Sequence, residues 1–237
     1  MSRSLPGDTL ALGVALSDGA VRGAANGEEG IMVRMAGKVV LVAGAGDNMG
    51  RAIPVLLAQE GAGLVLVSRN RSELDGTAER CRDAGARVET LAGDVTLEAV
   101  AREAVERSVA GFGRLNGLVF AAGGFFRPES RAEEIPTAQW DQAMTNLVRG
   151  LLVMAQAALP AFDEQGGGSM VALGAAPQTR LEGGAAYAAG KEALKGLVRR
   201  LAREFWPRNV RVNLISPGLI AAPLDEGPIR PMPRTHL

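Results

Sequence analysis

The strongest constraint on the fold is a regular alternation of short apolar runs with helical patterns after residue 38. The run 39–42 is continuously apolar, which is typical of a strand buried on both faces of a parallel sheet. Similar runs recur at 64–67, 87–91, 118–121, 169–173 and 210–215, and helical patterns separate them at 49–59, 72–84, 97–110, 139–162 and 185–206. Short strand–helix connections favour parallel strands with right-handed crossovers. We therefore predict an α/β fold, a doubly wound parallel sheet of about six strands.

The two ends of the chain do not share this pattern. Residues 1–34 are rich in Gly, Ala, Asp and Glu without sustained periodicity. We interpret them as a disordered leader, or as a non-native one preceding a natural start at Met32 or Met35. Residues 225–237 are rich in proline and predict an irregular tail. The folded domain is expected over 35–224.

Composition narrows the classes of function. The 26 basic and 26 acidic residues balance, so neither nucleic acid nor an anionic membrane is indicated as a partner. No apolar run has the length of a membrane span, and the short run 10–16 is a poor signal peptide, so we expect a cytoplasmic protein. Cys81 and His236 are the only residues of their types, and no metal site is therefore expected.

The connection after the first predicted strand is rich in glycine. It reads Ala-Gly-Ala-Gly-Asp-Asn-Met-Gly over 43–50 and leads directly into a helix. In this context glycine lets backbone N–H groups approach a pyrophosphate at the positive end of the helix. The cofactor-binding residues predicted here are Gly44, Gly46, Asn48, Met49 and Gly50. The alternative is a tight turn that binds nothing.

The connections after the second and third strands bear on the choice of cofactor. A free 2′-hydroxyl is usually met by a carboxylate after the second strand, but Ser68 and Arg69 stand there. The guanidinium suits a 2′-phosphate, so we predict NADP(H) in preference to NAD(H), the alternative being a solvated surface arginine. After the third strand, Asp94 of the pair Asp94–Val95 either accepts from an adenine amino group or caps the next helix.

The strongest chemical signal is Tyr187 followed four residues later by Lys191. At this spacing the two side chains share one face of a helix. A nearby ammonium favours the phenolate and is expected to lower the tyrosine's pKa toward neutrality. The only tyrosine of the chain is thus a candidate general acid for a carbonyl substrate.

Together these motifs resemble the short-chain dehydrogenase/reductase family over about residues 38–224, and the stretches 121–123 and 213–218 also match its pattern. The resemblance implies a Rossmann-type fold, a homodimer or homotetramer, and hydride transfer between NADP(H) and a carbonyl or alcohol, a 3-oxoacyl compound being one candidate. It implies that Tyr187 moves the proton, that Lys191 binds the nicotinamide ribose and that Asn146 holds a relay water. It further implies that the cofactor contacts include Ala122, Gly123, Pro217, Gly218 and Ile220.

The chain also departs from the family pattern. The family's catalytic serine falls at Gly174 or Ala175, and neither residue can donate to a substrate oxygen. Such a loss typically costs about 10²–10³ in rate, and neither Ser169 nor Thr179 is expected to compensate. Other departures are Ala43, Asn48, Phe120, Ala121 and Ala222, with asparagine expected to tolerate a positive φ at 48.

Family members also continue through a further helix and strand, so the resemblance implies a degenerate, shortened member without the last strand. Three interpretations therefore stay open: an active reductase, a nucleotide-binding protein without turnover, and a truncated reading frame.

Overall fold

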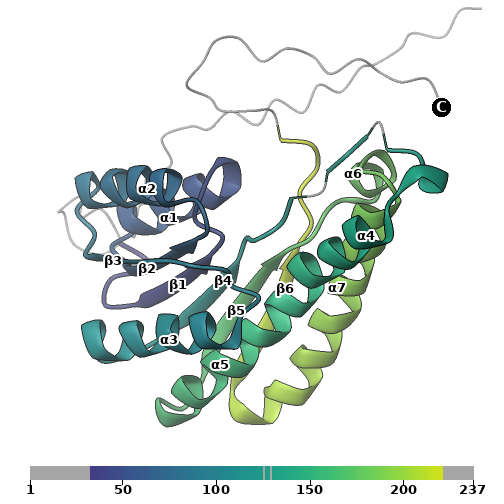
Figure 1. Ribbon diagram of the computed structural model, residues 1–237. Coiled ribbons are helices and arrows are strands. Elements are labelled where there is room, and N and C mark those ends of the chain that lie inside the picture. The colour runs from purple at the N-terminus through teal and green to yellow at the C-terminus, as the bar shows by residue number, and fades with distance from the viewer. Residues whose placement is uncertain (1–32, 125, 129, 221–237) are drawn as a thin grey trace, which may run out of the picture. The chain divides into compact units, whose positions relative to one another are not determined.

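The computed structural model describes residues 33–124, 126–128 and 130–220. Six parallel strands form one sheet in the order β3-β2-β1-β4-β5-β6 (Figure 1). The strands are β1 (Val39–Ala43), β2 (Gly63–Ser68), β3 (Val88–Ala92), β4 (Gly117–Phe120), β5 (Gly168–Leu173) and β6 (Val210–Ile215). The predicted doubly wound α/β fold is confirmed. The leader and tail predictions lie, apart from residues 33 and 34, outside the described residues.

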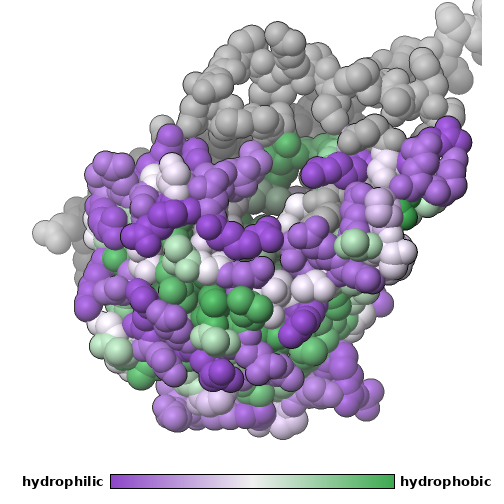
Figure 2. All heavy atoms as spheres, viewed as in Figure 1, coloured by the Kyte–Doolittle hydropathy of each residue, from purple (hydrophilic) through white to green (hydrophobic). Residues whose placement is uncertain are grey.

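Helices pack on both faces of the sheet (Figure 1). On one face, α1 (Asn48–Gln59) and α2 (Arg71–Asp83) close a core around Val40, Leu64 and Leu74. On the other face, α3 (Glu98–Phe112), α5 (Gly150–Glu164) and α7 (Ala185–Phe205) pack on Leu118 and Met170. Figure 2 shows that hydrophilic side chains cover most of the molecular surface in this view, with apolar side chains gathered toward its middle.

The helical segment expected over 139–162 is interrupted. It consists of α4 (Thr137–Met144), a π-helical turn η2 (Thr145–Arg149) and α5. A π turn shifts the hydrogen bonds by one residue and is frequent at functional sites. A shift of one residue leaves the apolar pattern of the segment helical, so the sequence could not reveal the π-helical turn.

Three short helices were also absent from the prediction. They are η1 (Ala132–Glu134), α6 (Pro177–Glu182) and η3 (Trp206–Arg208). Each is shorter than two helical turns, so no hydrophobic stripe can mark it in the sequence. Of these, α6 matters most for function because it lies between β5 and α7, next to the expected active site.

The strand order reverses between β1 and β4, which are direct neighbours. At such a switch point the connections leave the carboxyl ends of two strands in opposite directions and open a crevice between them. Here these connections begin at Gly44 and at Ala121. The fold therefore places the glycine-rich turn at the position where open α/β sheets bind ligands.

Candidate active site

A cleft of about 650 Å³ opens at this switch point. It runs from the end of β2, past the glycine-rich turn, to the first turns of α7. The predicted site residues that line it are Gly44, Gly46, Asn48, Met49, Gly50, Ser68, Arg69, Val95, Ala122, Gly123, Tyr187, Lys191, Pro217, Gly218 and Ile220. Asp94 and Asn146 are not among the lining residues.

The glycine-rich turn is held by close backbone packing. Gly44 has a φ of 95°, and a Cβ there would lie 2.4 Å from the backbone nitrogen of Ala122. A Cβ on Gly50 would lie 2.1 Å from the carbonyl oxygen of Gly44. Asn48 adopts a φ of 44°, which confirms that asparagine tolerates the positive φ of this turn.

The first turn of α1 is suited to an anion. No side chain caps this helix, and its first turn contains no acidic residue. The first N–H groups of a helix have no partner within it, so an uncapped N-terminus presents donors and a positive partial charge. Asn48 and Met49, the first two residues of the helix, line the cleft, and such a helix start fits the pyrophosphate of a dinucleotide.

The end of the cleft near β2 holds both signs of charge. Arg69 is exposed and lines this end of the cleft. Glu73, on the first turn of α2, also lines the cleft, and sequence analysis missed it. A carboxylate was expected only directly after the strand, whereas Glu73 reaches the site from the following helix. The sequence did contain a signal for Glu73: it stands three residues after Asn70, and an acidic residue three positions after a capping asparagine lies at the start of the helix.

Asp94 has a structural role in its turn. Its Oδ1 accepts a hydrogen bond of 2.9 Å from the backbone N–H of Thr96. The backbone N–H of Leu97 donates to its carbonyl oxygen over 3.0 Å. The helix cap considered for Asp94 was wrong, because α3 begins at Glu98, its N-cap residue is Leu97, and no side chain caps it. The bonds of Asp94 stabilise the turn before that helix, and the adenine contact stays a prediction.

Tyr187 and Lys191 lie together on the buried face of α7, with 9% and 6% of their surfaces exposed. The Nζ of Lys191 is 5.6 Å from the centroid of the Tyr187 ring and donates a 2.7 Å hydrogen bond to the carbonyl oxygen of Leu173. The Phe126 ring meets Tyr187 edge-on at a centroid distance of 5.4 Å. The predicted pair thus shares one face and one cleft.

The expected lowering of the tyrosine's pKa is not found. Burial raises the pKa of Tyr187 above its ordinary value, and the charge of Arg180 only partly opposes this. Burial also lowers the pKa of Lys191 to about 8. Burial of the phenol therefore outweighs the attraction between the ammonium and the phenolate on which the expectation rested. The ammonium itself donates to the carbonyl oxygen of Leu173.

The buried lysine has a consequence for stability. Its pKa is about 8 in the folded chain against 10.5 ordinarily, so between these values the unfolded chain binds more protons at this side chain. The free energy of unfolding should therefore rise with pH across this window, relative to a Lys191→Met variant. Urea denaturation of both proteins at several pH values tests this. A difference between parent and variant that does not change with pH would contradict it.

Asn146 lies in the π-helical turn and is buried. The next residue, Leu147, packs against α7: a Cβ on Gly190 would lie 2.6 Å from its Cδ1. The turn is thereby fixed against the helix that carries Tyr187 and Lys191. In the described structure the Asn146 side chain makes no hydrogen bond to either residue, so its role in a proton relay stays a prediction.

Neither of the two residues predicted to stand at the family's serine, Gly174 and Ala175, carries a hydroxyl. Gly174 lines the cleft immediately after β5, and Ala175 is buried. Ser169 lies in β5, is paired with Gly117 of β4, and does not line the cleft. Thr179, expected beyond the site, does line it, because α6 folds back beside α7. It is 6% exposed, and its hydroxyl has no hydrogen-bond partner among the described residues.

Other groups in the described part of the chain offer no competing chemistry. Cys81 is fully buried in α2, and burial raises the pKa of its thiol to about 11. Within the described residues, no three His, Cys, Asp or Glu side chains are grouped to hold a metal ion. None of the helices there combines the length and apolarity needed to cross a membrane.

An open α/β sheet with such a cleft at its switch point defines the class of Rossmann-type nucleotide-binding proteins. Comparison with known families places the chain within this class. The family described as short chain dehydrogenase matches residues 38–229. The chain belongs to this family, as the resemblance predicted.

Individual relatives differ in what they act on. The chain is 36% identical over 190 residues to cis-1,2-dihydrobenzene-1,2-diol dehydrogenase of Pseudomonas putida, covering 78% of this chain and 67% of that one. It is 29% identical over 195 residues to a 3-oxoacyl-[acyl-carrier-protein] reductase of Thermotoga maritima, covering 82% and 78%. A solved structure of carveol dehydrogenase from Mycobacterium avium in complex with NAD superimposes with a TM-score of 0.70 at 28% identity, covering 78% and 71%.

Proposed function

We propose that this chain is an NADP(H)-dependent oxidoreductase that transfers hydride between the nicotinamide and a carbonyl or alcohol carbon. The observation that carries the proposal is that Tyr187 and Lys191 lie in the same cleft as the glycine-rich turn. One cleft thus joins a pyrophosphate site to a proton donor. The alternative of nucleotide binding without turnover has one observation in its favour, the missing hydroxyl at Gly174.

Each residue has a distinct task in this mechanism. The nicotinamide, when bound, supplies or accepts the hydride. The Tyr187 hydroxyl gives its proton to the substrate oxygen during reduction, and the raised pKa keeps it protonated at neutral pH. Lys191, whose pKa is about 8, is mostly charged at pH 7 and holds the cofactor ribose.

The substrate is proposed to be a ketone or the corresponding secondary alcohol. The relatives include enzymes named for a 3-oxoacyl carrier compound and for a cyclic diol. The Phe126 ring that meets Tyr187 lines the cleft, and the apolar side chains of Leu219 and Ile220 line it as well. Such an apolar lining favours an uncharged carbon skeleton next to the reacting carbon.

The direct test is titration of the purified full chain with NADPH and NADH, followed by NADPH oxidation with a panel of 3-oxoacyl thioesters and cyclic ketones. Micromolar binding with turnover of at least one ketone is the expected result. Tight binding without turnover of any ketone would favour the silent alternative. Absence of binding by both cofactors would contradict the proposal.

Arg69→Ala tests the cofactor preference. The guanidinium is exposed at the cleft and suited to a 2′-phosphate, so its loss is expected to weaken NADPH binding by about tenfold or more. NADH binding should change by less than threefold. Equal losses for the two cofactors would contradict the role of Arg69.

The proposal extends to assembly and location. We propose a homodimer or homotetramer that pairs through α4, α5 and α7, where Trp140 and Leu152 are partly exposed apolar side chains. We also propose that the protein works in the cytoplasm on small molecules. Light scattering of the purified chain measures the assembly.

A further inference from the structure

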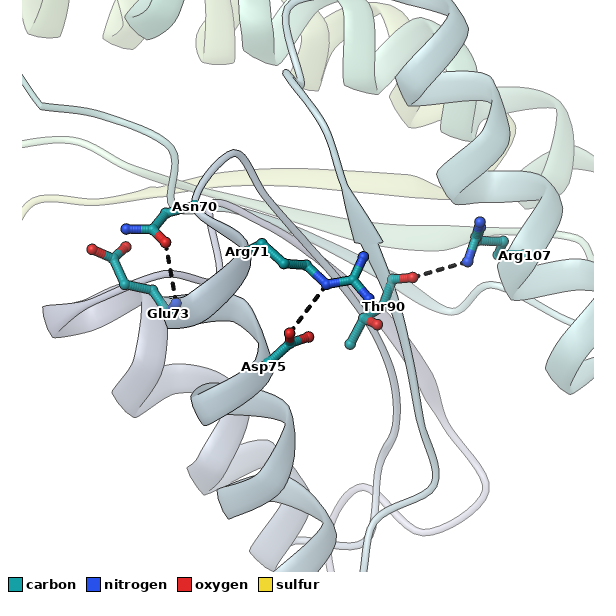
Figure 3. A network of polar contacts seen from close by, with 6 residues as sticks. All are labelled: Asn70, Arg71, Glu73, Asp75, Thr90 and Arg107. Carbon is teal, nitrogen blue, oxygen red and sulfur yellow. Dashed lines mark hydrogen bonds and ion pairs between the residues drawn. The ribbon is translucent and has the colours of Figure 1, made fainter.

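Glu73 occupies an unusual position at the start of α2. The side chain of Asn70 caps this helix and accepts a 3.3 Å hydrogen bond from the backbone N–H of Glu73 (Figure 3). In a reciprocal capping box, the acidic side chain would reach back to the N–H of the cap residue. No such bond is formed in the described structure. The carboxylate is therefore not used to complete the cap.

The carboxylate instead lies over the glycine-rich turn. A Cβ on Gly46 would lie 2.7 Å from Oε2 of Glu73 and 3.2 Å from Oγ of Ser68. The turn is fixed beneath α2 because the buried Thr77 hydroxyl donates to the carbonyl oxygen of Gly46 over 2.9 Å. Glu73 and Ser68 thus form one polar corner at the end of β2.

No cation neutralises Glu73 among the described residues. Its neighbour Arg71 pairs with Asp75 at 3.1 Å and points away from the Glu73 carboxylate (Figure 3). The charged residues that line this end of the cleft are Asp47, Arg69 and Glu73. By charge alone, two carboxylates and one guanidinium are a poor environment for a dianionic 2′-phosphate.

We propose that Glu73 is a second cofactor-specificity residue, which accepts a hydrogen bond from the free 2′-hydroxyl of NAD(H) and repels the 2′-phosphate of NADP(H). The proposal rests on the proposed function. Arg69 and Glu73 act in opposite directions at one corner, so the chain uses both cofactors, and its preference for NADP(H) is smaller than the arginine alone would give.

The test compares dissociation constants of NADPH and NADH for the full chain and for Glu73→Gln. Losing a charged acceptor should weaken NADH, and losing a repelling charge should strengthen NADPH, so their ratio should shift by about tenfold. Glu73→Lys should shift it further in the same direction. Glu79→Gln is the matched control, since it removes the same charge from an exposed position of α2 that does not line the cleft.

The outcomes distinguish a failure of the Glu73 contact from a failure of cofactor binding as a whole. If the parent binds both cofactors and the ratio moves by less than twofold in both Glu73 variants, this inference is overturned while the proposed function stands. If Glu79→Gln shifts the ratio as much as Glu73→Gln, the effect is one of net charge and the specific contact is again overturned. If the parent binds neither cofactor, the proposed function itself fails.

Discussion

Tyr187→Phe is expected to lower turnover by about 10²–10⁴, the range that a positioned general acid contributes. The variant loses only the hydroxyl. Its ring keeps the edge-on contact with Phe126 and stays in the cluster with Leu147 and Ala175, so the fold and the cleft should persist. The phenol is the only tyrosine hydroxyl of the chain, and no second one can take its place.

Steady-state rates with the best ketone of the panel measure the effect on turnover, and NADPH titration of the same variant is its control. Affinity should stay within a few-fold of the parent, because the hydroxyl acts on the substrate oxygen. A variant as fast as the parent would eliminate Tyr187 as proton donor. A large loss of NADPH affinity would mean that the residue mainly shapes the cofactor site.

The parts of this protein that sequence patterns predicted are those set by local chemistry. A continuously apolar run can only be a buried strand or helix, and its length selected the strand that became β1. The glycines at 44 and 50 had a local steric reason, which the close backbone contacts now explain. The Tyr187–Lys191 pair required only helical spacing to share a face.

What escaped prediction depends on packing between distant segments. Thr179 reaches the cleft only because a six-residue helix turns back before α7. Glu73 reaches Gly46 only because α2 packs over the turn after β1. The pKa of Tyr187 is governed by burial, which depends on how completely the surrounding elements enclose the ring. Spacing along the chain reports none of these quantities.

Gly174→Ser is expected to raise turnover by about tenfold or more. It would place a hydroxyl where the resemblance predicts the family's serine, in the cleft that holds Tyr187 and Lys191. A donor to the substrate oxygen is worth about 10²–10³ in rate. Gly174 is not among the residues with positive φ, so the backbone accepts a side chain. The new Cβ would lie 3.0 Å from Leu214 Cδ2 and from Ser216 Oγ, so these side chains must shift slightly, which reduces the gain.

Gly174→Ala is the matched control, since it adds the same Cβ against Leu214 and Ser216 without a hydroxyl. It should bring no gain in turnover. If the serine variant is no faster than the alanine variant, a missing donor at this position does not limit the parent.

The same experiment defines what Thr179 contributes. The unpartnered hydroxyl of Thr179 could itself donate to the substrate oxygen. In that case Thr179→Val should slow the parent by about tenfold. It should slow Gly174→Ser much less, because the effects of two donors to one oxygen are not additive. Equal fractional losses in both backgrounds would mean that the two hydroxyls act independently. No loss in either would mean that the parent works without a side-chain hydroxyl at that oxygen, and the gain from Gly174→Ser should then approach the full value of one donor.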